Sequence, residues 1–320
     1  MHRDVTNSEV IAPSDRPSGR RRGDRIVGSG SAMQEVVGQA LTAASALLPV
    51  RVQGPEGSGR QHIARAIHAW SGRSSGPFVV VSCSAEPASL LGREIFGCAD
   101  SAYSQLPEEY PGALSRAATG TLYLESVDRL ADSQRQALAK ALVERRFQRE
   151  GDGAGIALRA RLITSSEADA SPFGDLPQLT IRLLPLKDRR EDVLPLAAHF
   201  LRMHAEELGI TPVGFTSEAR EALLGESWPG NVRELGERVR MAVQLAGNGA
   251  ISAESLMLAA DGDQVPSFRD AKRAFETRYV VGLLRRCGGN ISRAARLAKK
   301  DRKDFYDVIR RTGVDPADFR

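Results

Sequence analysis

The sequence predicts an α/β domain built on a parallel sheet, then a helical region, then a small all-α domain at the C-terminus. Between residues 25 and 190, short apolar runs alternate with amphipathic stretches, as in parallel sheets flanked by helices. From 191 to 260 the apolar period is helical throughout. A segment with Gly, Asp and Pro then precedes a last helical stretch, so we expect domains at 25–190, 191–260 and 261–320. Residues 1–24 have no apolar period and are expected to be a disordered tail.

The positions of the apolar runs predict where the strands and helices lie. Strands are expected at 50–53, 78–82, 121–124, 161–164 and 180–184. Helices are expected at 61–70, 192–208, 217–224, 231–245 and 267–286, the last ended by Gly288 and Gly289. With 320 residues, of which 42% are hydrophobic, the chain is long enough for more than one buried core.

Composition excludes several classes of protein. No run of about 18 apolar residues is present, so we expect no membrane-spanning helix. The arginines at 20–22 and 25 are not followed by an apolar run, which argues against a secretory signal and for a cytoplasmic protein. Cys83, Cys98 and Cys287 lack metal-site spacing and are expected to be buried, reduced thiols.

Charge is concentrated at the C-terminus. Residues 266–320 hold fifteen Lys or Arg against seven Asp or Glu, a net of +8, whereas the whole chain has +4. A basic segment attracts polyanions, and nucleic acid is the obvious one. A solvated helical surface is the alternative interpretation.

A glycine-rich loop follows the first expected strand and precedes a helix. In this order, backbone N–H groups and the helix N-terminus form a cradle for phosphate. The spacing from Gly54 to Gly59 fits a phosphate loop, but Arg60 replaces the usual Lys and Gln61 replaces Ser or Thr. Taken alone, an ordinary tight turn is the alternative.

Further recognisable motifs occur along most of the chain. Residues 26–246 resemble the central AAA+ domain of sigma-54-dependent transcriptional activators, the bacterial enhancer-binding proteins. The matching segments include Glu94-Ile-Phe-Gly97, Gly120-Thr-Leu-Tyr-Leu-Glu125, Leu186-Lys-Asp-Arg-Arg-Glu-Asp-Val193 and Trp228-Pro-Gly-Asn-Val-Arg-Glu-Leu235. The resemblance implies an AAA+ P-loop parallel sheet at 25–190 with a helical lid at 191–260.

The resemblance also implies an ATP site. Its phosphate-binding residues would be Gly54, Gly57, Ser58, Gly59, Arg60 and Gln61. Ile26, Val27 and Val193 would lie near the adenine, and Arg233 would be the lid arginine that senses the nucleotide. The planar fork of Arg60 differs from a compact ammonium group, so we expect binding to be weak.

The parts that hydrolyse ATP depart from the family pattern. Family members close the third expected strand with an Asp-Glu pair, for magnesium and for water activation. Here the residues are Glu125, which could still reach Mg²⁺, and Ser126, which cannot act as a general base. An ordinary strand end is the alternative interpretation of these two residues.

Three further features are missing. The sensor Asn is replaced by Glu167, and the Asn expected before Cys83 is Ser82. Segment 173–180, where inter-subunit arginines would lie, has no Arg before Arg182. The loop that grips sigma-54 retains only Ala102 and Tyr103 of its motif, so remodelling of the polymerase is not expected. Since an arginine finger alone contributes about 10³ to 10⁵ in rate, hydrolysis should be close to absent.

The C-terminal stretch resembles a Fis-type helix-turn-helix. Asn290 is a good N-cap, Ala294 and Ala295 permit close helix crossing, and Phe305 with Ile309 forms an apolar face. Lys299 and Lys300 depart from the family turn. The residues expected to contact DNA are Arg293, Arg302, Lys303, Tyr306 and Arg310. A helical protein-interaction tail is the alternative, and the Phe268, Phe275, Tyr279 and Leu283 face is expected to mediate dimerisation.

These observations lead to one hypothesis and one alternative. The hypothesis is a regulator that binds double-stranded DNA and carries an AAA+ core that binds ATP without hydrolysing it. It would form a homo-oligomer, or a hetero-oligomer with an intact paralogue, with RNA polymerase or its sigma factor as a further candidate partner. The alternative is an active ATPase that remodels sigma-54 RNA polymerase holoenzyme.

Overall fold

The computed structural model describes residues 26–85, 87–99, 110–257, 268–298 and 300–319. It divides the chain into two compact units, Met1–Ala253 and Glu254–Arg320, which are treated separately below. The expected boundary at 260 and the expected tail at 1–24 both lie outside the described residues.

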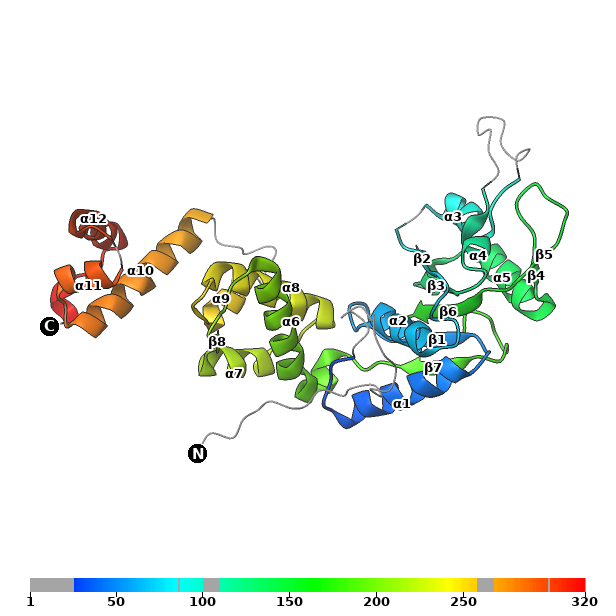
Figure 1. The fold of residues 1–320 in the computed structure, drawn as a ribbon, viewed down its shortest axis with the longest axis horizontal. Helices are drawn as coiled ribbons and strands as arrows, with labels where there is room; N and C mark the ends of the chain where they lie inside the picture. Colours follow the sequence, from blue (N-terminus) through cyan, green and yellow to red (C-terminus); the bar gives the residue numbers. More distant parts are fainter. Residues whose placement is uncertain (1–25, 86, 100–109, 258–267, 299, 320) are drawn as a thin grey trace. The chain divides into compact units, whose positions relative to one another are not determined.

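The first unit contains a five-stranded sheet with the order β2-β3-β6-β1-β7. Every neighbouring pair is parallel (Figure 1). The strands are β1 (Val50–Gln53), β2 (Phe78–Ser82), β3 (Thr121–Glu125), β6 (Arg161–Ser166) and β7 (Leu179–Arg182). The five predicted strands and the α/β fold class are thereby confirmed. β7 ends two residues earlier than predicted, ahead of Pro185, which has no N–H to extend a ladder.

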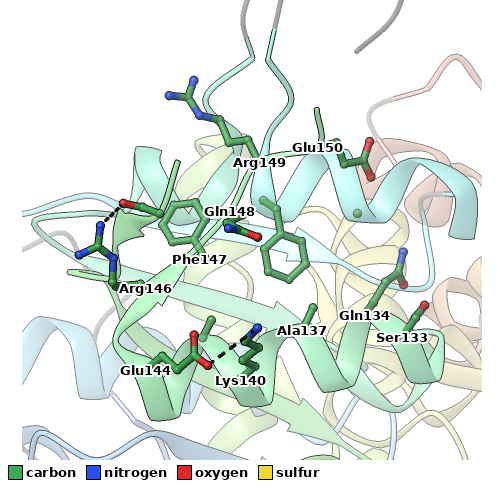
Figure 2. Close-up of a pocket in the computed structure, with 14 residues that line it drawn as sticks. Ser133, Gln134, Ala137, Lys140, Glu144, Arg146, Phe147, Gln148, Arg149 and Glu150 are labelled. Carbon is green, nitrogen blue, oxygen red and sulfur yellow. Dashed lines mark hydrogen bonds and ion pairs between the residues drawn. The ribbon is translucent and has the colours of Figure 1, made fainter. Parts of the chain in front are cut away.

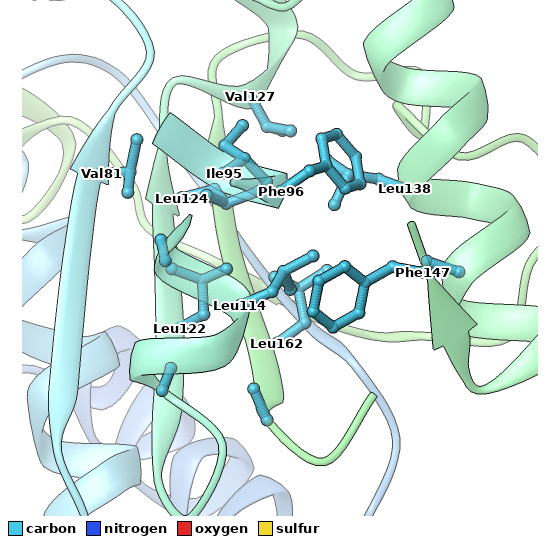
Figure 3. Packing of buried hydrophobic residues seen from close by; sticks show 14 of the residues in the cluster. Val81, Ile95, Phe96, Leu114, Leu122, Leu124, Val127, Leu138, Phe147 and Leu162 are labelled. Atoms are coloured by element: carbon cyan, nitrogen blue, oxygen red, sulfur yellow. The ribbon is translucent and has the colours of Figure 1, made fainter. Parts of the chain in front are cut away.

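Each face of the sheet packs against helices. In β3, Tyr123 points to one face and Leu122 and Leu124 to the other, since successive strand side chains alternate. Leu122 and Leu124 join the cluster shown in Figure 3, together with Ile95 and Leu138. The helices of this unit that precede β7 are α1 (Ser31–Ser45), α2 (Arg60–Trp70), α3 (Ala88–Phe96), α4 (Gly112–Arg116) and α5 (Asp132–Glu144).

A helical region follows β7. Two 3₁₀ turns, η3 (Leu186–Asp188) and η4 (Arg190–Asp192), lead into α6 (Val193–Leu208), α7 (Ser217–Gly225), α8 (Asn231–Ala246) and α9 (Ala253–Met257). The short pairs β4 (Arg146–Phe147) with β5 (Ile156–Ala157), and β8 (Gly214–Phe215) with β9 (Ala250–Ile251), were not predicted, nor was η2 (Val127–Arg129). Two-residue strands are too short to show a period of two.

The second unit is a small helical bundle with its own core. It contains α10 (Phe268–Cys287), α11 (Ile291–Leu297), α12 (Arg302–Thr312) and η5 (Pro316–Phe319). Asn290 Oδ1 accepts a hydrogen bond from Arg293 N at 3.1 Å, which confirms the predicted N-cap. The core residues are Val280, Leu284, Cys287, Ala294, Ala295, Phe305, Val308 and Ile309.

The dimerisation face predicted on α10 is described only in part. Leu283 is half-buried and packs against the core of its own bundle. Tyr279 is exposed, whereas the side chains of Phe268 and Phe275 lie outside the described residues.

Two expectations from composition can be compared with the structure. Cys83, Cys98 and Cys287 are all buried and unpaired with one another, as predicted. Across the described ranges, none of the helices combines the length and the apolar character needed to cross a bilayer.

Candidate nucleotide site and DNA-binding face

The loop between β1 and α2 has the backbone geometry of an anion cradle. Gly57 and Gly59 have φ values of +73° and +103°, a region that favours glycine. Gly59 is the N-cap of α2 and no side chain caps this end of the helix. The first-turn amides of Arg60 and Gln61 are therefore available to a ligand, with the helix dipole favouring an anion.

The loop is held closely by the start of α8. A Cβ on Gly57 would lie 2.2 Å from the carbonyl oxygen of Gly230, so no larger residue fits here. Arg233 N donates to Gly57 O at 3.1 Å, and Asn231 Nδ2 donates to Glu56 O at 2.9 Å. Sequence reasoning placed Arg233 at this site but missed Asn231, which also accepts a hydrogen bond from Leu186 N at 2.8 Å.

A buried ion pair joins the loop to the start of the described chain. Arg189 Nη2 donates to Ser58 O at 2.8 Å, and Asp192 Oδ1 accepts from Ser29 N at 2.7 Å and Gly30 N at 3.0 Å. Arg189 Nη1 lies 3.9 Å from Asp192 Oδ2. Burial lowers the pKa of Arg189, and the Asp192 carboxylate opposes that shift. Both residues lie in segment 186–193, which carries the family resemblance, but neither was predicted to have a role in the site.

An apolar cavity of about 640 Å³ opens beside the loop. Ser58 and Gly59 line it on the loop side, and Ile26 and Val27, which the resemblance places near the adenine, also line it. Val193, at the start of α6, is buried and is not among the residues that line this cavity. The other apolar lining residues are Met33, Ile63, Leu183, Leu196, Phe200, Met203 and Val232.

A smaller polar cavity of about 260 Å³ lies at the carboxyl ends of the central strands. It brings together six residues singled out from the sequence, namely Arg60, Ser82, Glu125, Ser126, Glu167 and Arg233. Arg60 is 4% exposed, and its Nη1 donates to Gly54 O at 3.0 Å and lies 3.8 Å from Glu167 Oε1. The loop cation is therefore already engaged by the protein itself.

The position after Glu125 is conformationally unusual. Ser126 has φ +55°, in the left-handed region that non-glycine residues seldom adopt. Ser126 N donates to Ser165 Oγ at 3.2 Å, and the buried Tyr123 hydroxyl donates to the same oxygen at 2.9 Å. These two hydrogen bonds hold the end of β3 against the end of β6.

Carboxylates near this cavity act on the neighbouring Cys83. Burial, and after it the charges of Asp128 and Glu125, together raise the pKa of Cys83 to about 12. Arg233 Nη1 contacts Glu56 Oε1 at 2.7 Å, but both side chains are more than half exposed, so this pair contributes little stability.

The side chains present can supply only part of a metal site. Within the described ranges, no three His, Cys, Asp or Glu side chains are grouped closely enough to hold a metal ion. Magnesium, however, commonly binds through one or two carboxylates together with the phosphates of a nucleotide. Glu125 fits that requirement, since it lines the polar cavity.

Another cavity, of about 570 Å³, lies beside α5 and the β4–β5 hairpin (Figure 2). It contains none of the residues predicted to bind nucleotide. Lys140 Nζ and Glu144 Oε1 are 3.8 Å apart in it, and Arg146 Nη2 donates to Gly155 O at 2.6 Å.

In the second unit, α12 presents two exposed stripes of different charge. Arg302, Tyr306 and Arg310 recur at intervals of four residues with Lys303 beside them, and all four are exposed. Asp304, Asp307 and Arg311 lie on the other exposed stripe. The structure thus groups the predicted DNA-contacting residues of α12, and Arg293 is exposed on α11.

Comparison with known proteins identifies the family. Residues 26–175 match the sigma-54 interaction domain, and residues 187–272 match the AAA+ ATPase lid domain. The chain is 31% identical over 310 residues to the transcriptional regulatory protein GlrR of Escherichia coli K12, covering 93% of this chain and 70% of that protein. The chain belongs to the sigma-54-dependent transcriptional regulators. It is also 33% identical over 303 residues to ZraR of Klebsiella oxytoca, covering 89% of this chain and 68% of that protein.

Solved structures of this regulator family agree with the fold. NtrX from Brucella abortus in complex with ADP superimposes with a TM-score of 0.66 and 27% identity, covering 91% of this chain and 70% of that one. The same protein in complex with ATP gives a TM-score of 0.66 and 26% identity, with the same coverage. The AAA+ fold predicted from the sequence is therefore confirmed.

Proposed function

We propose that this regulator binds DNA through α12 and carries an AAA+ domain that binds adenine nucleotide without hydrolysing it. The observation that supports this most strongly is the contrast within one site. A phosphate loop that keeps its glycines adjoins a cavity lined by Ser126 and Glu167, which the family resemblance places at the general base and the sensor.

Nucleotide binding is supported by the loop and the apolar cavity. The α2 N-terminus would receive the phosphates through the loop residues predicted from the sequence, with the adenine against Ile26 and Val27. Glu125 would hold Mg²⁺ together with the phosphates. Because Arg60 is already bound to Gly54 O and faces Glu167, we expect the affinity to be low.

The loss of hydrolysis follows from three replacements. A serine hydroxyl at 126 cannot accept a proton from water at neutral pH, which costs about 10² to 10⁴ in rate. Glu167 brings negative charge to the sensor position, where the family has a neutral Asn. No arginine occurs from 173 to 181, where an inter-subunit finger is expected. The AAA+ domain would then serve as an oligomerisation platform, in a homo-oligomer or with an intact paralogue.

DNA binding is supported by the basic stripe of α12 and the +8 charge of residues 266–320. The helix would enter the major groove, and the protein would act at promoters in the cytoplasm. RNA polymerase or its sigma factor is a further candidate partner through the family's sigma-54 interaction domain.

An active ATPase that remodels sigma-54 polymerase is the second candidate. It is favoured by the family and by Glu125, which retains a carboxylate at the end of β3. Loop residues 100–106, predicted to have lost the sigma-54 grip, lie outside the described residues.

The DNA-binding claim is tested with matched arginine variants of the full chain. In mobility shifts with genomic fragments, Arg302→Ala should weaken binding about tenfold, as loss of one bidentate base contact does. Arg311→Ala removes the same charge from the same helix but from the stripe with Asp304 and Asp307, so it should have a smaller effect. Equal effects of both variants, or no shift by the wild-type protein, would contradict the assignment.

A further inference from the structure

The side chain of Arg60 marks where the end of a nucleotide's phosphate chain would lie. In a phosphate loop, the cation at this position reaches the β- and γ-phosphates, whereas backbone amides cradle the earlier ones. Here the guanidinium of Arg60 lies in the polar cavity, 3.8 Å from the carboxylate of Glu167. A terminal phosphate drawn to Arg60 would therefore approach a carboxylate.

The other charged residues that line the polar cavity do not offset the negative charge of Glu167. Its ionisable lining consists of four carboxylates, Glu56, Glu125, Asp128 and Glu167, against the arginines Arg60, Arg129 and Arg233. Two of the arginines are already paired, Arg60 with Glu167 and Arg233 with Glu56. Asp128 Oδ1 is buried and has no hydrogen-bond partner within the described structure.

A diphosphate would avoid most of this repulsion. Its two phosphates can be held by the loop amides and the N-terminus of α2, where no side-chain carboxylate caps the helix. The third phosphate of ATP adds negative charge next to Glu167, in a cavity whose carboxylates outnumber its arginines.

We propose that Glu167 makes this site select nucleoside diphosphate over nucleoside triphosphate. This proposal rests on the nucleotide binding proposed above and assigns that site a preferred ligand.

The test compares two glutamate variants that are matched in side-chain exposure and in the distance to their ionic partner. Glu167 is 52% exposed and lies 3.8 Å from Arg60, while Glu144 is 53% exposed and lies 3.8 Å from Lys140 in the other cavity (Figure 2). Glu167→Gln and Glu144→Gln thus each remove one half-exposed charge from one ion pair. Only Glu167→Gln changes the phosphate site.

Calorimetric titration of the full chain with ADP and with the non-hydrolysable analogue adenylyl imidodiphosphate provides the measurement. EDTA is included so that no divalent cation offsets the carboxylates. We expect ADP to bind about tenfold more tightly than the analogue, from one added charge at short range. Glu167→Gln should reduce this ratio to about threefold or less by tightening the analogue, and Glu144→Gln should leave the ratio unchanged.

The outcomes separate the two proposals. Equal binding of the two ligands by the wild-type chain, or a ratio that Glu167→Gln does not change, overturns the diphosphate preference and leaves the nucleotide site in place. Failure of both ligands to bind overturns the nucleotide site, and the preference with it.

Discussion

The two halves of the proposed nucleotide site differ sharply. The half formed by the glycine loop and the apolar cavity has the backbone conformation, open helix end and apolar walls that a nucleotide needs. The half at the ends of β3 and β6 has a serine after Glu125, a glutamate facing Arg60 and an excess of carboxylates. Binding and hydrolysis depend on different atoms, so one can be kept while the other is lost.

The largest effect on nucleotide affinity is expected from a substitution in the glycine loop, the half of the site that is suited to binding. Gly59→Asp places a carboxylate at the helix N-terminus and forces a side chain onto a φ of +103°. Affinity for ADP should fall by at least about a hundredfold, measured by calorimetric titration. Gly174→Asp is the matched control, since Gly174 also has a positive φ, +63°, and open space around it. Similar losses from both variants would show that the loop is not the site.

A smaller effect is expected at the apolar wall. Val27→Ser removes part of the hydrophobic surface available to the base, so ADP affinity should drop about fivefold. Val143→Ser makes the same change on α5, where Val143 is 66% exposed, and should leave affinity unaltered. If Val27→Ser binds ADP as tightly as the wild-type chain, the adenine does not lie in this cavity.

The smallest effect is expected from a single substitution at the ends of β3 and β6, where the residues for hydrolysis depart from the family pattern. Ser126→Glu restores a carboxylate after Glu125, yet ATP turnover should stay undetectable because Glu167 and the missing arginines remain. The measurement is phosphate release at saturating ATP. Turnover that appears with this single change would mean that only the general base had been lost.

The sequence was sufficient for features that are local along the chain. The five strands of the central sheet, the loop glycines and the Asn290 cap each depend on neighbouring residues, and the strand ends lie within two residues of the predicted ones.

The contacts that join distant segments were not predictable from one sequence. Arg60 and Glu167 were singled out separately, but their pairing depends on how β6 lies beside β1. Likewise, Arg189 donates a hydrogen bond to the loop, and Asp192 accepts hydrogen bonds from residues 29 and 30. Val193, which the resemblance placed near the adenine, does not line the apolar cavity. Such pairings arise from tertiary packing, which no local period encodes.

The central claim is that the wild-type chain binds nucleotide without hydrolysing it. The most direct measurement follows release of γ-phosphate from radiolabelled ATP by the purified full chain, at a concentration where calorimetry shows the site to be occupied. We predict no release above the protein-free background. Turnover near about one per second, at the lower end of ordinary enzymes, would contradict the account and support an active ATPase.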